Sequence, residues 1–229
     1  MKILIVTIKT WNIKEANNFK NSSKEHLVKI ITNPEEFNSV SVNDFSPDYI
    51  FFPHWSWIIP KEIFEKYKCV VFHMTDLPFG RGGSPLQNLI KKGIADTKIS
   101  AILVSEELDA GKVYMKHSLN LNGTADEILI RASKIVFYKL IPTIIESDII
   151  PTTQSGDIVC FKRRKPHESE ILESISNLEK LYDHIRMLDG EGYPKAFVKV
   201  GKFIFEFSRA SFKGEHILSD VTIREVENE

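Results

Sequence analysis

Short apolar runs alternate with longer, more polar stretches over the first two thirds of the chain. The apolar runs are rich in β-branched and aromatic residues and predict strands at residues 2–7, 26–32, 48–54 and 69–74. Helices are predicted between these strands, one in the polar stretch after the first strand and one at residues 60–67. This rhythm predicts an α/β fold built on a doubly wound, mostly parallel sheet.

Further elements follow the fourth strand. A helix is predicted over residues 84–94, and a strand pair lies within residues 97–121. Apolar residues at helical spacing then predict the longest helix, over residues 124–147, and Thr124 with Glu127 forms the pattern of a capping box at its start.

A change of composition marks a domain boundary. Residues 149–157 are rich in Pro, Ser, Thr and Gly, which is typical of a linker. We therefore predict a larger domain at 1–150 and a small C-terminal α+β region at 151–229. In the latter we expect an amphipathic helix from about residue 168 to 188 and two alternating strands within 196–210, which offer a surface for a homodimer.

The net charge and the two cysteines limit which binding partners and bound groups are expected. Lys and Arg total 30 against 31 Asp and Glu, a net charge of -1, which argues against nucleic-acid or membrane binding. Cys69 and Cys160 each lie in an apolar run, so we expect two buried thiols, no disulfide and no metal site. No stretch is long and apolar enough to span a membrane, and we expect a soluble, cytoplasmic protein.

The most unusual stretch begins where a buried strand ends in His73. A loop carrying Arg81, Gly82 and Gly83 follows before the next helix. Ligands bind at the carboxyl ends of strands in doubly wound sheets, so His73 is placed as a catalytic base would be. A lone histidine between Phe and Met is, however, more often a hydrogen-bonded structural residue.

A second element is the tight turn that carries Asp109, between two predicted strands. On physical grounds alone, this aspartate would stabilise its own turn. Together the two segments resemble the catalytic domain of the formyltransferase family, whose pattern is His-x-Ser, Leu-Pro, Arg-Gly-x-x-Pro and, downstream, Asp-x-Gly. The matching residues here are His73, Thr75, Leu77, Pro78, Arg81, Gly82, Pro85, Asp109 and Gly111. The resemblance is dense over residues 47–115 and looser after residue 160.

The resemblance implies a catalytic role for residues 1–150. His73 would accept the proton that the attacking amine loses, Asp109 would orient the imidazole, and Thr75 would complete the catalytic set. The sequence departs from the family at Val71, where members carry an asparagine that donates to the developing oxyanion. Candidate replacement donors are Thr75, Asn88, Ser56, protonated His73 and backbone N–H groups.

The resemblance also implies 10-formyltetrahydrofolate as cosubstrate. Its pterin needs an apolar slot with a few polar groups. The residues expected to bind it are Trp55, Trp57, Arg81, Leu103 and Ser105. The residues expected to bind the acceptor are Arg81, Gly82, Gly83, Arg163, Arg164 and Tyr193.

The acceptor expected from the resemblance is the amino group of a nucleotide-linked deoxyamino sugar, such as a UDP-4-amino-4,6-dideoxy hexose of a pseudaminic-type pathway for surface glycans. The region at 151–229 is short and not strongly basic, which disfavours the alternative acceptor, methionyl-tRNA. Glycinamide ribonucleotide is a further alternative. Val71 also leaves open a non-catalytic module that binds folate or nucleotide.

Overall fold

The computed structural model describes residues 1–226, so the last three residues of the predicted C-terminal region lie outside the described part. The chain forms two compact units. The large unit comprises residues 1–82, 97–119 and 129–160, and the small unit comprises residues 83–96, 120–128 and 161 onward. The two units are therefore composed of different segments from the predicted domains 1–150 and 151–229, whose division of function stays a prediction.

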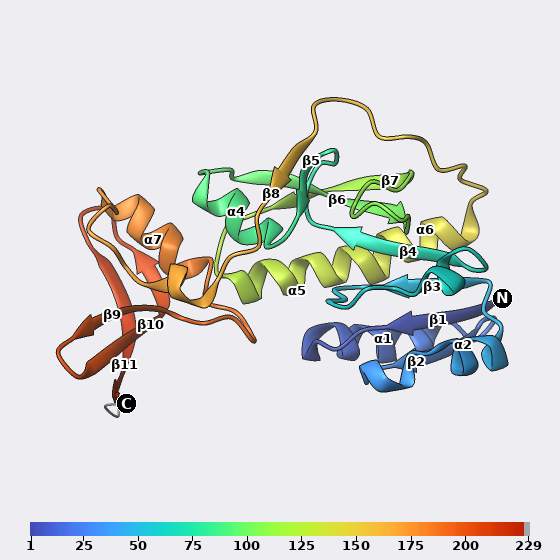
Figure 1. The fold of residues 1–229 in the computed structure, drawn as a ribbon, viewed down its shortest axis with the longest axis horizontal. Helices are drawn as coiled ribbons and strands as arrows, with labels where there is room; N and C mark the ends of the chain where they lie inside the picture. Colours follow the sequence, from blue (N-terminus) through green and yellow to red (C-terminus); the bar gives the residue numbers. More distant parts are fainter. Residues whose placement is uncertain (227–229) are drawn as a thin grey trace. The chain divides into compact units, whose positions relative to one another are not determined.

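A six-stranded sheet forms the centre of the large unit (Figure 1). Its order is β2-β1-β3-β4-β6-β7, and the first four strands in this order run parallel, whereas β4 pairs antiparallel with β6. The bounds are β1 Lys2–Val6, β2 Leu27–Ile31, β3 Tyr49–Phe52, β4 Lys68–His73, β6 Asp96–Leu103 and β7 Val113–Asn120. The predicted α/β fold with a mostly parallel sheet is confirmed.

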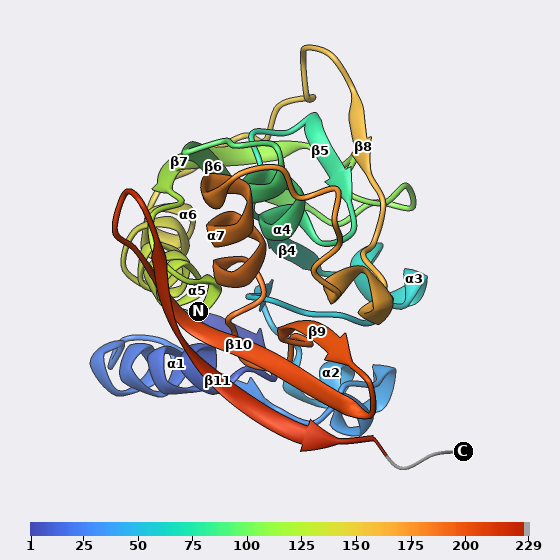
Figure 2. The ribbon, with the colours of Figure 1, turned by 90° about the vertical axis from the view of Figure 1, so that its left-hand side faces the viewer.

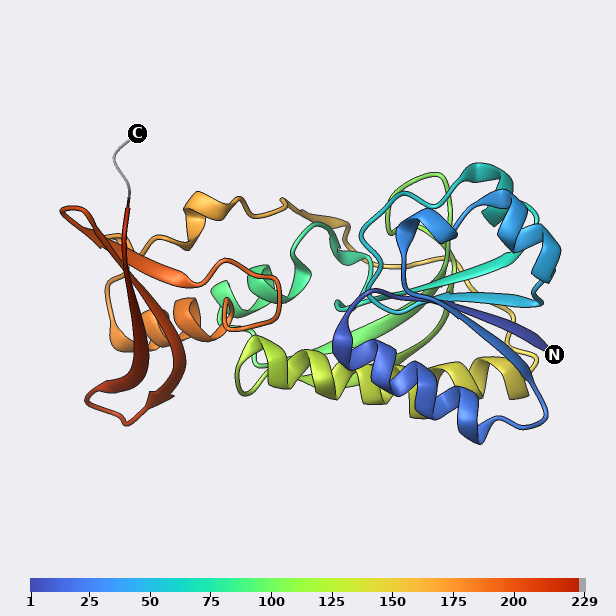
Figure 3. The same cartoon turned by 90° about the horizontal axis from the view of Figure 1, so that it is seen from below.

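Helices cover both faces of this sheet, which explains the uninterrupted apolar run of β1, where Ile3, Leu4, Ile5 and Val6 are fully buried. Figure 3 shows α1 and the chain of α5, η2 and α6 on one face, with α2 and α3 on the other. The bounds are α1 Thr10–Ser22, α2 Ser39–Phe45, α3 Lys61–Phe64, α5 Ala125–Ile135, η2 Val136–Leu140 and α6 Ile141–Glu146.

The predicted long helix over 124–147 is interrupted by the π-helical turn η2. Pro142 lies in the first turn of α6, and proline lacks the N–H and clashes with the carbonyl of a continuous α-helix, which accounts for the change of winding before it. The predicted capping box is present, because Thr124 N–H donates to Glu127 Oε2 at 2.8 Å and Glu127 N–H donates to Thr124 Oγ1 at 3.3 Å.

The small unit contains a three-stranded antiparallel sheet in the order β11-β10-β9, and α7 packs beside β10 (Figure 2). This sheet and helix form the expected small α+β appendage. The bounds are α4 Pro85–Lys91, η3 Pro166–Ser169, α7 Leu178–Arg186, β9 Ala196–Val200, β10 Phe203–Phe212 and β11 Ile217–Glu225.

The helix predicted over 168–188 is wrong in its first half. Ile171 N–H donates to the Phe197 carbonyl at 2.7 Å, so this stretch is extended along β9 instead. The helix begins at Leu178, where the side chain of Asn177 caps it by accepting the Lys180 N–H at 2.8 Å.

Two short strands, β5 Phe79–Gly82 and β8 Val159–Phe161, form a separate pair. Neither β5 nor β11 was predicted. None of the helices in residues 1–226 is long and apolar enough to cross a membrane.

Candidate active site

His73 ends β4, and its side chain is buried, with 9% exposed. Its Nδ1 lies 3.4 Å from Asp109 Oδ1, and its Nε2 lies 2.8 Å from the Gly80 carbonyl oxygen, to which the Thr75 hydroxyl also donates at 3.4 Å. Both ring nitrogens therefore face acceptors. An imidazolium can donate to both and a neutral imidazole to only one, so the arrangement suits a histidine that has taken up a proton.

The carboxylate of Asp109 joins two segments. Its Oδ1 faces His73 and its Oδ2 accepts the Gly82 N–H at 2.8 Å. Asp109 has φ 55, in the left-handed region that aspartate tolerates better than most residues. Two residues on, a Cβ at Gly111 would lie 1.7 Å from the Leu103 carbonyl oxygen, so only glycine lets the turn approach β6 this closely. The turn is thereby fixed beside His73.

Arg81 is buried and held by partners within the protein. Its Nε and Nη2 donate to Gln154 Oε1 at 3.1 and 2.9 Å, and its Nη1 donates to Glu107 Oε1 at 3.1 Å. Gln154 in turn donates through Nε2 to the carbonyls of Asp109 and Gly111, at 2.7 and 2.9 Å. One amide side chain thus joins the Arg81 loop to the Asp109 turn.

The sequence pattern did not indicate Gln154 as a site residue. It lies in the segment 149–157, whose composition indicated a linker. A single glutamine among Pro, Ser and Thr carries no pattern that distinguishes it from linker glutamines. Only the fold shows that this segment returns to the site.

Ion pairs of Asp76 with two lysines hold the loop after His73 in place. Lys116 Nζ lies 2.5 Å from Asp76 Oδ1 and donates to the Leu77 carbonyl, and Lys98 Nζ lies 2.9 Å from Asp76 Oδ2. Burial raises the pKa of Asp76, but the hydrogen bonds and charges of the two lysines outweigh burial and lower the pKa overall. Asp76 is therefore ionised at neutral pH.

Val71 lies two positions before His73 on β4, where the family resemblance implied an asparagine. Its side chain packs against Leu77, Ile102 and Val113. An amide at this position would enter an apolar cluster, so the local packing is adapted to valine.

The three hydroxyl and amide side chains among the candidate replacement donors occupy different environments. The Thr75 hydroxyl donates to the Gly80 carbonyl. The Asn88 amide lies in the small unit and donates to three backbone carbonyls there. Ser56 is exposed. Two of the three are thus already engaged within the protein, and an oxyanion role for any of them stays a prediction.

The two tryptophans predicted to hold the pterin lie together, with ring centroids 4.8 Å apart. Trp55 packs against Phe37 and Phe52 in the core, whereas Trp57 is 48% exposed. Ser105 is exposed and its hydroxyl donates to the Glu107 carbonyl. Val104, between Leu103 and Ser105, packs in the same core cluster as Trp55.

The residues predicted to bind the acceptor are divided between the units. Arg81 and Gly82 belong to the large unit, and Gly83, Arg163, Arg164 and Tyr193 belong to the small unit. Arg164 and Tyr193 line one small pocket. Burial, with a contribution from the charge of Asp126, raises the pKa of Tyr193.

The cysteine prediction is half wrong. Cys69 is buried, which raises the pKa of its thiol to about 12, but Cys160 is exposed because β8 leaves its side chain uncovered. Residues 1–226 contain no cluster of three His, Cys, Asp or Glu side chains suited to a metal ion.

Comparison with known proteins identifies the family. The formyl transferase family model matches residues 10–132, which include His73 and Asp109. The chain belongs to the formyl transferase family. Residues 166–224 of the chain match a second model, the C-terminal domain of methionyl-tRNA formyltransferase.

Individual relatives of the chain are methionyl-tRNA formyltransferases. Over 98% of the chain, a solved methionyl-tRNA formyltransferase from Clostridium thermocellum is 56% identical with a TM-score of 0.96, and 99% of that chain is covered. The methionyl-tRNA formyltransferase of Bacillus mycoides (strain KBAB4) is 31% identical over 150 residues, which are 62% of this chain and 48% of the relative. The chain thus spans about half the length of the curated relatives it matches.

A more distant neighbour shows the fold alone. HypX from Aquifex aeolicus, solved with tetrahydrofolic acid, has a TM-score of 0.74 at 18% identity, over 92% of this chain and 38% of that chain.

These comparisons overturn two expectations. The nucleotide-linked amino sugar, with its glycan pathway, is wrong as the acceptor, because the C-terminal match and the 56% identical structure are to methionyl-tRNA formyltransferases. The expected absence of a nucleic-acid partner is wrong for the same reason. Net charge does not reveal such a partner because it sums over the whole chain, whereas basic residues gather locally in the small unit.

Proposed function

We propose that this protein transfers the formyl group of 10-formyltetrahydrofolate to the amino group of methionyl-tRNA, in the cytoplasm. The observation that carries the proposal is the contact between His73 and Asp109 at the carboxyl end of β4, in a chain 56% identical to a solved methionyl-tRNA formyltransferase along nearly its whole length. Residues 1–150 would then form the catalytic domain.

In the proposed reaction the amine nitrogen attacks the formyl carbon and a C–N bond forms. The amine proton passes to His73, whose cationic form the Asp109 carboxylate and the Gly80 carbonyl stabilise. The C–N bond to the folate then breaks, and the folate nitrogen leaves with a proton returned by His73. The Thr75 hydroxyl donates to the Gly80 carbonyl and so positions the carbonyl oxygen that His73 Nε2 contacts.

Cosubstrate binding is assigned to Trp57, with its exposed ring, and to the strand end at Leu103 and Ser105. Trp55 supports Trp57 from the core cluster. The family and the tetrahydrofolic acid bound to HypX support folate as the cosubstrate.

The direct experiment mixes the purified protein with 10-formyltetrahydrofolate and methionyl-tRNA. Formylmethionyl-tRNA is measured by mass spectrometry after release of the amino acid, and tetrahydrofolate is measured in parallel. We expect both products in equal amounts, and none with deacylated tRNA.

Val71 favours a second candidate, a module that binds folate without turning it over. One oxyanion donor is typically worth ~10²- to 10³-fold in rate, so losing the family asparagine is a substantial loss. Folate binding with no formylated product from methionyl-tRNA would support this module and contradict the transferase.

A further inference from the structure

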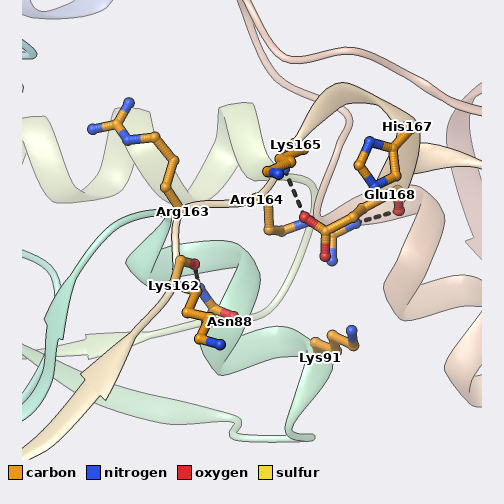
Figure 4. Close-up of a pocket in the computed structure, with 8 residues that line it drawn as sticks. All are labelled: Asn88, Lys91, Lys162, Arg163, Arg164, Lys165, His167 and Glu168. Carbon is orange, nitrogen blue, oxygen red and sulfur yellow. Dashed lines mark hydrogen bonds between the residues drawn. The ribbon is translucent and has the colours of Figure 1, made fainter.

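A cavity of about 330 Å³ lies wholly within the small unit (Figure 4). Five of its lining side chains are permanent cations, and a single carboxylate, Glu168, opposes them. The cations are Lys91 from the end of α4, and Lys162, Arg163, Arg164 and Lys165 from the segment before η3. A chain with a net charge of -1 thus concentrates positive charge at one concave site.

Three exposed cations of this cavity have no ionic partner in the described part of the chain. Throughout residues 1–226, Lys91, Lys162 and Arg163 form no ion pair within 4 Å, whereas in the same unit Lys195 pairs with Asp189 at 2.6 Å and Lys202 pairs with Glu225 at 2.6 Å. Like charges held together repel one another, and a bound anion would relieve that repulsion.

The backbone of the cavity is fixed independently of these charges. Gly83 allows the close approach of the basic segment, because a Cβ there would lie 2.5 Å from Arg163 Cβ. The Asn88 amide donates to the Lys162 carbonyl at 3.0 Å, and the Arg164 N–H donates to Ser84 Oγ at 3.1 Å. The cations therefore project from a preformed frame, which lowers the entropic cost of binding.

Glu168 offsets only part of the positive charge, because it is one carboxylate against five cationic side chains. Its Oε2 accepts the Lys165 N–H at 2.6 Å, and this hydrogen bond, followed by the charges of Arg164, Lys91 and His167, lowers its pKa against the opposing effect of burial. Arg164 Nη2 donates to the Glu168 carbonyl at 2.5 Å, whereas Arg164 Nε is buried and has no hydrogen-bond partner in the described chain.

Besides burial, the positive charges of the cavity also lower the pKa of His184. Burial lowers the pKa of His184, and the charges of Arg164 and Lys91 lower it further, against a hydrogen bond to the Ser169 carbonyl. Two cations of the cavity, Arg164 and Lys91, therefore also affect a histidine that is not among its lining residues.

We infer that this cavity binds a phosphate group. Lysines beside an arginine suit a dianionic phosphate better than a single carboxylate, since the guanidinium donates to two oxygens and each ammonium adds charge. The phosphate belongs either to the end of an RNA chain or to a small phosphorylated molecule. The RNA end is the source we favour, and that choice alone rests on the proposed function.

The test is a calorimetric titration of the full chain with inorganic phosphate and with pyrophosphate. Lys91→Gln and Lys162→Gln should each weaken binding about tenfold, the usual worth of a charge-assisted hydrogen bond. Lys202→Gln is the matched control, because it removes an equal charge from the same unit at a lysine that is already paired. Thermal unfolding of each variant checks that the fold is retained.

A second arm titrates a short RNA hairpin carrying a 5′-phosphate against the same hairpin with a 5′-hydroxyl. Tighter binding of the phosphorylated hairpin, lost in Lys91→Gln, assigns the source to an RNA end, and equal binding of the two hairpins assigns it to a small molecule. No binding of phosphate or pyrophosphate, or binding unchanged by both cavity variants, overturns the inference. Formylation is measured separately, so an inactive protein that binds phosphate would contradict only the proposed function.

Discussion

Two charged regions of this protein are organised in opposite ways. Around His73 in the large unit, charged groups are satisfied internally: the histidine faces Asp109, Arg81 is bound by Gln154 and Glu107, and Asp76 holds two lysines. At the cavity of the small unit, Lys91, Lys162 and Arg163 have no ionic partner within residues 1–226. Internal pairing fixes geometry, whereas unpaired charge on a fixed frame is suited to an external ligand.

Among the substitutions that test this contrast, His73→Ala should have the largest effect on activity. Loss of the base should lower the rate of formyl transfer ~10²- to 10⁴-fold, and the thermal unfolding midpoint should change little because the removed ring makes only two polar contacts. Single-turnover kinetics and a thermal scan measure both quantities. Retained activity would remove His73 from the catalytic set.

Asp109→Asn should have the next largest effect. The amide oxygen can still accept the Gly82 N–H, but the negative charge beside His73 is lost, so we expect a rate about 10²-fold lower with the fold intact. The comparison with Asp109→Ala separates charge from positioning, because alanine removes the Gly82 contact as well. Equal rates for the wild type and Asp109→Asn would show that the carboxylate charge is not needed.

Gln154→Ala should lower stability. It removes the partner of buried Arg81 and two hydrogen bonds to the Asp109–Gly111 turn, so the free energy of unfolding should fall by about 1–3 kcal/mol in urea denaturation. Gln154→Glu keeps acceptors for Arg81 and loses only the donors to the two backbone carbonyls. The stability of this variant should therefore lie between those of the wild type and Gln154→Ala. An unchanged denaturation midpoint for Gln154→Ala would show that this amide does not hold the site together.

Asp76 gives a smaller, pH-dependent effect. Its pKa is lower in the folded protein than in the unfolded chain, so its stabilising contribution is complete above the unfolded pKa and is lost as the pH falls through the folded pKa. Its side chain is 42% exposed, so the contribution should be at most about 1 kcal/mol. Asp76→Asn should lose this amount at pH 7 and nothing at strongly acidic pH, as measured by denaturation at both values.

Lys91→Gln should change stability least, by no more than about 0.5 kcal/mol, because an unpaired surface cation contributes little to folding. Thermal denaturation in phosphate-free buffer measures the effect. A strong destabilisation would show that Lys91 supports the fold, and it would remove the contrast between the two regions.

The sequence predicted the elements whose signal is local. The β-branched runs of β1 to β4 and the capping box at Thr124 need only neighbouring residues to be recognised. The pairing of β4 with β6 and the extended stretch before α7 depend on contacts with distant segments, as the hydrogen bond from Ile171 to Phe197 illustrates.

The candidate site divides in the same way. His73 and Asp109 were found because a family resemblance links two local motifs. Gln154 has no local motif, and its role arises from hydrogen bonds to residues 43 to 73 positions away. The cationic cavity was also hidden, because Lys91 and the basic segment 162–165 become neighbours only in the folded small unit.

The position of Gln154 also sets the order in which this region can be completed during synthesis. His73, Arg81 and Asp109 all leave the ribosome before residue 154 does, and until then Arg81 lacks the amide that links it to the Asp109 turn. A nascent chain truncated before Gln154 therefore carries the whole predicted catalytic set, but it lacks the hydrogen bonds that join the Arg81 loop to the Asp109 turn.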